Sequence, residues 1–406
     1  WGEARSSGAR LRGGAEIDLE GTAEEPVVLS LVPEGNQLRD EAEDAAGVST
    51  GLVSAIALSL SREAFVAEGQ ARAELQGSEG RWRLDSDRIR GLRESGDGEG
   101  GSPFQFEVTA VRELRLDSAL ERSTFSADQV WVDGVILGEP GTNLAMDEAR
   151  SIEVRAQGDV RVTIESLAPD GPLELLAAWS MEAASATLQR GAQGNDLRAP
   201  FTLVAEQVGR GHFEGGGVSA DLSADQVEVD GMVGSRTALS AEDRDKALVG
   251  SSLTATGKVQ AAFVMDPSRP PVHGRGDHFL LVDGQRGQLG ADPGKRVRAR
   301  GMLPDREEPY VLTARSIDFT RVELRAVEPV LEIQGAGPLM EFGGLRLQQI
   351  SGEYLVADRE RAVLSGSEER PVLGTGLNDN QQPVSIRARR LELPLGELGD
   401  PDRESG

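Results

Sequence analysis

The stretch FSADQVWVDG at residues 125–134 recurs as LSADQVEVDG at residues 222–231, with eight of ten positions identical. Its apolar residues stand at the first, third, sixth and eighth positions. On a helix, at about 100° per residue, these positions point in opposed directions. On a strand, the first two positions share one face and the last two share the other. All four can face one interior only if a bulge or sharp bend interrupts the strand. The stretch therefore predicts a strand, a corner and a second strand, and we call it the corner motif.

The corner motif also occurs in degenerate form. LTARSIDF at residues 312–319 and IRARRLEL at residues 386–393 keep the four apolar positions, and a weaker copy, LDSDRIR, begins at Leu84. The intervals between successive copies are 41, 97, 90 and 74 residues, which are too uneven for a strict solenoid repeat. They favour a meander of antiparallel strands in which the same motif forms several of the bends. The apolar positions predicted to line its interior are Phe125, Val130, Val132, Leu222, Val227, Val229, Leu312, Ile317, Phe319, Ile386, Leu391 and Leu393.

Alternation of apolar and polar residues dominates the rest of the chain and predicts an all-β fold. Two stretches, residues 143–153 and 173–190, are also compatible with helix, and we favour strand for the second. Glycine-rich stretches such as GRGHFEGGG at residues 209–217 are predicted to be loops. The clearest alternating stretches are residues 26–33, 54–61, 151–165, 253–264 and 321–335.

Composition excludes several classes of function. The formal charge of −25 argues against a nucleic-acid partner, which needs clustered basic residues. The absence of cysteine excludes disulfides and thiolate chemistry, and it fits a protein outside the cytoplasm. The N-terminal residues lack the apolar segment of a signal peptide, and no apolar run approaches the ~20 residues of a membrane helix.

Catalytic and metal-binding patterns are weak. HGRGDH at residues 273–278 holds two of the three histidines, but its spacing matches no standard zinc pattern, and we expect a solvated loop. No G-x-S-x-G, H-E-x-x-H or Walker motif occurs. The carboxylates are too numerous for a catalytic pair to be singled out. We therefore expect no catalysis, no cofactor and no metal site.

The degenerate corner motif resembles the periodic motif of the OstA-like family of periplasmic lipopolysaccharide-transport proteins. The two stretches most similar to the family are residues 297–319 and 361–393. The resemblance is clearest over about residues 200–400 and weaker over residues 115–235, and the first hundred residues match only in general character. It implies a long antiparallel β-jelly-roll, folded on itself, that shields acyl chains in an apolar groove lined by the twelve residues named above. It further implies a periplasmic location, with any inner-membrane anchor outside this chain. The partners would be lipopolysaccharide or another lipid, and other β-jelly-rolls that pair through edge strands.

On this basis we expect an N-terminal β region at residues 1–114, jelly-roll units at residues 115–240 and 241–400, and a polar tail at residues 401–406. A structural or adhesive all-β repeat protein of the cell envelope is the main alternative. An enzyme whose site lies on loops is a third. An open apolar interior would favour lipid transport, and a filled core would favour a structural role.

Overall fold

The computed structural model describes residues 2–5, 8–12, 16–24, 26–31, 50–55, 57–60, 64–76, 80–93, 102–118, 121–136, 149–167, 175–190, 198–215, 218–234, 252–264, 271–282, 286–302, 309–320, 323–333, 340–342, 345–358 and 361–394. Strands fill most of these ranges, and no helix occurs within them. The strand pairings assigned in these ranges are antiparallel, both between long neighbouring strands and between short ones. The predicted all-β, antiparallel, jelly-roll-like fold is therefore confirmed.

The chain forms two compact units. Unit 1 comprises residues 1–209 and 228–250, and unit 2 comprises residues 210–227 and 251–406. Two strands, β13 (Arg198–Gly215) and β14 (Val218–Gly234), contribute residues to both units. The sequence-based boundaries at residues 114 and 240 stay a prediction.

The other strands of unit 1 become long after the first six. They are β1 (Gly2–Arg5), β2 (Gly8–Arg12), β3 (Glu16–Glu20), β4 (Val27–Leu31), β5 (Thr50–Ala55), β6 (Ala57–Leu60), β7 (Ala64–Gln76), β8 (Gly80–Arg93), β9 (Ser102–Ser118), β10 (Glu121–Ile136), β11 (Ala149–Leu167) and β12 (Leu175–Arg190).

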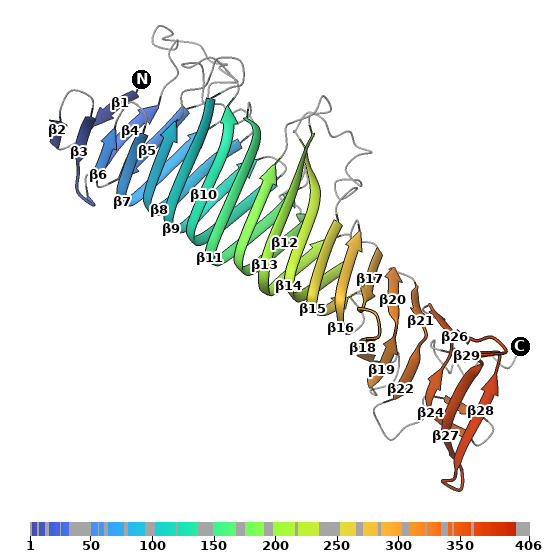
Figure 1. Ribbon diagram of the computed structural model, residues 1–406. Coiled ribbons are helices and arrows are strands. Elements are labelled where there is room, and N and C mark those ends of the chain that lie inside the picture. Colours follow the sequence, from blue (N-terminus) through green and yellow to red (C-terminus); the bar gives the residue numbers. More distant parts are fainter. Residues whose placement is uncertain are drawn as a thin grey trace, which may run out of the picture. The chain divides into compact units, whose positions relative to one another are not determined.

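Each long strand of unit 1 has two halves that belong to different layers. The first half of β7 pairs with β6 and its second half with β5, and the ladder between β7 and β8 shifts register between Glu68 and Ala71. Equivalent shifts interrupt the ladders from β8 to β12 near mid-strand. Figure 1 shows β7 to β11 side by side along this bent sheet. The corner motif on β10 lies at one shift, between Ser126 and Gln129, as predicted.

The backbone at the corners alternates from strand to strand. Residues with positive φ occur on every second strand of the series β7 to β15, where a left-handed residue produces the bend. The non-glycine residues among them are Gln70, Ala110, Asp159, Gln207 and Lys258, and on β7, β11 and β15 a glycine with positive φ directly precedes them. The strands between them, β8, β10 and β14, carry the copies of the corner motif that begin at Leu84, Phe125 and Leu222. Two kinds of corner therefore alternate along the sheet.

Unit 2 continues the same design with shorter strands. They are β15 (Ser252–Val264), β16 (Val272–Val282), β17 (Arg286–Gly290), β18 (Val297–Met302), β19 (Pro309–Ala314), β20 (Ser316–Thr320), β21 (Leu324–Val327), β22 (Val330–Ile333), β23 (Met340–Phe342), β24 (Leu345–Ser351), β25 (Tyr354–Ala357), β26 (Arg361–Ser365), β27 (Val372–Asn378), β28 (Pro383–Ala388) and β29 (Arg390–Pro394).

In unit 2 the corners separate short strands that form two layers. Wing A contains β17, β20, β21, β25, β26 and β29, and wing B contains β18, β19, β22, β24, β27 and β28. The second half of β16 pairs with β17 and its first half with β18, so β16 joins both wings. Figure 1 shows the two rows of strands that make up this unit.

The strand predictions are confirmed for the described residues of each alternating stretch named above, while residues such as 32–33, 321–322 and 334–335 lie outside the described ranges. Residues 175–190 of the ambiguous second stretch form β12. Two loop predictions are wrong. Residues 209–215 belong to β13, and HGRGDH lies within β16, with a corner at Gly276 and Asp277. The loops were predicted from their high glycine content. In this protein, glycine also occurs inside strands, at bends and where the layers pack closely. Of the first ambiguous stretch, residues 149–153 are strand and residues 143–148 lie outside the described ranges.

Candidate functional site

The residues predicted to line an interior all lie on the inward side of their strands. Nine of them are buried: Phe125, Val130, Leu222, Val227, Val229, Leu312, Ile317, Phe319 and Leu393. The other three, Val132, Ile386 and Leu391, are half-buried. The corner motif thus places apolar side chains inward on both sides of a bend. Whether lipid contacts them stays a prediction.

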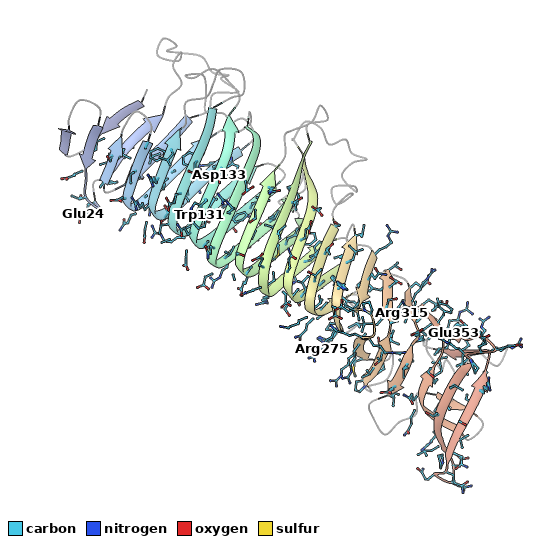
Figure 2. All side chains as sticks on the ribbon, in the orientation of Figure 1. Glu24, Trp131, Asp133, Arg275, Arg315 and Glu353 are labelled. Carbon is cyan, nitrogen blue, oxygen red and sulfur yellow. The ribbon has the colours of Figure 1, made fainter. Side chains whose placement is uncertain are left out.

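Inside and outside alternate residue by residue on β10. Val130 is 1% exposed, whereas the next residue, Trp131, is half-buried on the opposite face. Asp133 shares that outer face with Trp131, and both are labelled in Figure 2. The Asp133 carboxylate accepts a hydrogen bond from Gln105 at 2.8 Å and pairs with Arg155 at 2.5 Å. The sheet therefore has an apolar inner face and a charged outer face.

Small residues occupy the third position of the corner motif. Ala127, Ala224 and Ala314 hold the third motif position and are 0–7% exposed. In the copy on β8 this position is Ser86, whose buried hydroxyl donates a hydrogen bond to the Ala71 carbonyl at 3.4 Å. A small side chain at this position lets the two layers approach at the bend.

Further corner motifs escaped the sequence analysis because alanine or glycine stands at the inward positions. They begin at Met181 on β12, Gly274 on β16 and Ile350 on β24, with the same spacing of inward residues. These copies divide the three long intervals between the motifs found from the sequence. The interval of 97 residues becomes intervals of 56 and 41 residues, that of 90 becomes 52 and 38, and that of 74 becomes 38 and 36. A search for the spacing of the inward positions that also allowed alanine and glycine at those positions would have found these copies.

An aromatic cluster fills part of the interior of unit 2. Phe263 on β15 and Phe319 on wing A stack with parallel rings whose centroids lie 4.3 Å apart. Phe279 lies 6.1 Å from Phe319. Phe263 belongs to the half of β15 that pairs with the wing B side of β16, so the stacked rings join the two layers. All three rings are at most 3% exposed. At this position the interior is filled by protein side chains.

The polar residues of HGRGDH organise one corner. Lys295 Nζ lies 2.9 Å from Asp277 Oδ1 and 3.0 Å from Asp292 Oδ2, and His278 Nε2 lies 2.9 Å from Asp292 Oδ1. The backbone N–H of Asp292 donates to Asp277 Oδ2 at 2.9 Å, and this bond, followed by the Lys295 ammonium, lowers the pKa of Asp277. Hydrogen bonds from Lys295 and then His278 lower the pKa of Asp292. These bonds tie the β17–β18 connection to β16.

A similar cluster holds a corner of unit 1. Arg112 on β9 pairs with Asp85 at 2.6 Å and with Asp87, and it donates to the Ser86 carbonyl at 2.8 Å. Hydrogen bonds to Asp87 and Asp85 raise the pKa of Arg112. Within the described ranges, no three His, Asp or Glu residues group as metal ligands would. None of the described segments contains a helix long and apolar enough to span a membrane.

Comparison with protein-family models, curated proteins and solved structures gives no match to this chain.

Proposed function

We propose that this chain is a non-catalytic lipid-binding and transport component of a cell envelope, which shields acyl chains of a lipopolysaccharide-type lipid between the layers of its bent sheet. The observation that carries the proposal is the corner motif. In its clearest copies, on β10 and β14, it turns apolar side chains inward on both sides of the bend and leaves charged ones outside. The resemblance to the OstA-like family adds the lipid class and the periplasmic location.

Physical chemistry supports an acyl chain as the ligand. The inward residues of the motif are mainly Val, Leu, Ile and Ala, whose side chains offer an apolar lining without hydrogen-bonding groups. Each buried methylene of an acyl chain would contribute about 0.8 kcal/mol. The chain is strongly acidic, with a net charge of −25, so an anionic headgroup would stay in water, away from the inner face.

A structural or adhesive envelope protein is the second candidate, and the stacked Phe263 and Phe319 rings favour it. Side chains that meet across the interior at 4.3 Å leave no room for an acyl chain between them. On the transport proposal, these rings must move apart when lipid passes. On the structural proposal, they are a permanent part of the core.

Photo-crosslinking distinguishes the two candidates. A benzoylphenylalanine replaces Val132, which is half-buried on the inner face of β10, and in a matched variant it replaces Trp131 on the outer face of that strand. After irradiation of cells, we expect lipid adducts from position 132 and none from position 131, measured by mass spectrometry of the purified protein. Adducts to protein alone at position 132, or equal lipid adducts at both, contradict the proposal.

Edge-strand pairing with another β-jelly-roll is the proposed mode of assembly. Within the described chain, β28 pairs with β27 and β29 pairs with β26, and neither has a second partner strand. Each therefore presents an edge to which a further strand can be added. Ile386→Pro on β28 should abolish oligomers in light scattering, while Ile386→Val keeps them. An unchanged mass for the proline variant, with its circular dichroism spectrum intact, would rule out this edge.

A further inference from the structure

The outer face of wing B in unit 2 carries two rows of basic side chains. Arg275 on β16 stands directly opposite Arg298 on β18, and His273 stands opposite Arg300. All four side chains are exposed, because Gly274, Val297 and Ala299 take the inward positions between them. We call these four residues the arginine patch: His273, Arg275, Arg298 and Arg300. Arg275 is labelled in Figure 2.

The arginine patch has no internal counter-charge. No ion pair within the described part of the chain joins Arg275, Arg298 or Arg300 to a carboxylate. The flanking positions are also neutral, with Gln260 opposite Arg275 on one side and Thr313 opposite Arg298 on the other. Like charges on directly opposed residues destabilise a sheet. The arrangement therefore costs stability, and no ion pair within the described residues of unit 2 offsets it.

Three arginines of wing A show the contrasting arrangement, although Arg286 on β17 of the same wing has no ion pair within the described residues. Arg325 pairs with Glu323, Arg361 pairs with Glu392 at 3.2 Å, and Arg390 pairs with Glu392 at 3.4 Å. Each exposed arginine among these three has a carboxylate partner. A high arginine content therefore does not by itself leave guanidinium groups unpaired in this unit.

The sequence around the patch is unusual for this chain. Residues 251–300 contain eight Lys or Arg and four Asp or Glu, whereas the whole chain has 43 basic and 68 acidic residues. The patch is thus a local positive region on an acidic protein. Such a region attracts an acidic partner and fixes its orientation.

We propose that the arginine patch is a docking surface for an extended acidic segment of a partner protein, with carboxylates on alternate residues. Successive outward residues of a strand lie about 6.6–6.8 Å apart, which is the spacing of Arg298 and Arg300 along β18. Alternate side chains of an extended peptide have the same spacing. Its carboxylates therefore match the row of guanidinium groups, each of which can bind a carboxylate through two parallel hydrogen bonds. This surface is independent of the apolar interior and of the proposed lipid.

Two other anionic partners fit less well. The patch lies on the open face of a sheet, so a small phosphate would be largely exposed to water, which weakens an ionic contact. Docking to an anionic bilayer typically uses clusters of roughly four to eight basic residues, and here the rest of the protein is acidic. A polypeptide that contacts several arginines at once suits both the geometry and the charge.

The test measures binding of a fluorescent ten-residue peptide of alternating Glu and Thr to the full chain by anisotropy. The patch variant Arg275→Gln/Arg298→Gln/Arg300→Gln is compared with the matched wing A variant Arg325→Gln/Arg361→Gln/Arg390→Gln. Both lose three positive charges, so a general charge effect weakens binding equally. We expect the patch variant to bind at least about ten-fold more weakly than wild type, and the wing A variant to bind within about three-fold of wild type.

The melting temperature shows whether each variant is folded, and relief of repulsion should keep that of the patch variant at or above the wild-type value. A control peptide of alternating Gln and Thr should not bind. Equal losses in both triple variants would overturn the proposal. So would patch-dependent binding of pyrophosphate, or of vesicles containing one-third phosphatidylglycerol, without binding of the acidic peptide.

Discussion

The Asp225 carboxylate lies directly against Gly257 on the neighbouring corner, where the glycine has φ of +73°. The same relationship joins Asp128 to Gly158, whose φ is +77°. In both cases a Cβ on the glycine would overlap the aspartate side chain. In both copies of SADQ, the aspartate at the fourth position of the corner motif therefore packs against a glycine of the adjacent strand, where a larger residue would not fit.

Gly257→Ala should destabilise the protein by about 1–3 kcal/mol, because alanine is strained at this φ and its Cβ collides with Asp225. The measurement is the urea-unfolding midpoint. Gly209→Ala is the control, since no atom lies within 4 Å of the added Cβ, and it should stay within about 1 kcal/mol of wild type. Equal effects of both substitutions would show that the corner does not require glycine.

A second glycine relationship ties the aromatic cluster to β17. Gly287 stands opposite Phe319, and a Cβ at residue 287 would overlap the phenyl ring. Gly287→Ala should therefore cost about 1–3 kcal/mol, and much less in a Phe319→Leu background, with a coupling energy of about 1 kcal/mol or more in a double-mutant cycle. Gly290→Ala on the same strand meets its nearest atom at 3.8 Å and should be almost neutral. Additive effects of Gly287→Ala and Phe319→Leu would contradict this packing.

These glycines also show which parts of the fold can be predicted from the sequence and which cannot. Alternation and the spacing of the corner motif predict strands and bends, because side-chain direction follows local backbone geometry. The partner of each corner was not predictable, since Asp225 and Gly257 come together through the pairing of distant strands. The stacking of Phe263 on Phe319 was equally inaccessible, because it depends on how two layers meet. The prediction for HGRGDH failed for a related reason: its glycines belong to the packed corner of β16 and not to a loop.

Asp277 should contribute stability that disappears in acid. Its hydrogen bonds from the Asp292 backbone and Lys295 lower its pKa below the ordinary aspartate value of 3.8, so the folded state favours the carboxylate. This contribution is present above about pH 3.8 and is lost as the pH falls through the lower folded-state pKa. Asp277→Asn should therefore be less stable than wild type at pH 7, and the difference should shrink below pH 3.8 in urea unfolding.

The control for Asp277 is Asp379→Asn, which changes an exposed carboxyl group after β27 that has no ion pair within the described residues. It should leave stability at pH 7 unchanged. A difference between wild type and Asp277→Asn that stays constant from pH 7 down to about pH 2 would mean that its charge plays no part.

Phe319→Ala should separate the two candidate functions. Removing this buried ring, which is 3% exposed, should cost about 3–5 kcal/mol on either candidate. It also breaks the contact with Phe263 that joins the two layers of unit 2. If acyl chains occupy the interior, this space becomes available to them, and native mass spectrometry of the variant purified from its own cells should show more bound lipid than wild type. Tyr354→Ala removes an outward ring that is 55% exposed and should change neither stability nor lipid content. A less stable Phe319→Ala protein that carries no lipid, like the wild type, would instead favour a permanently filled structural core.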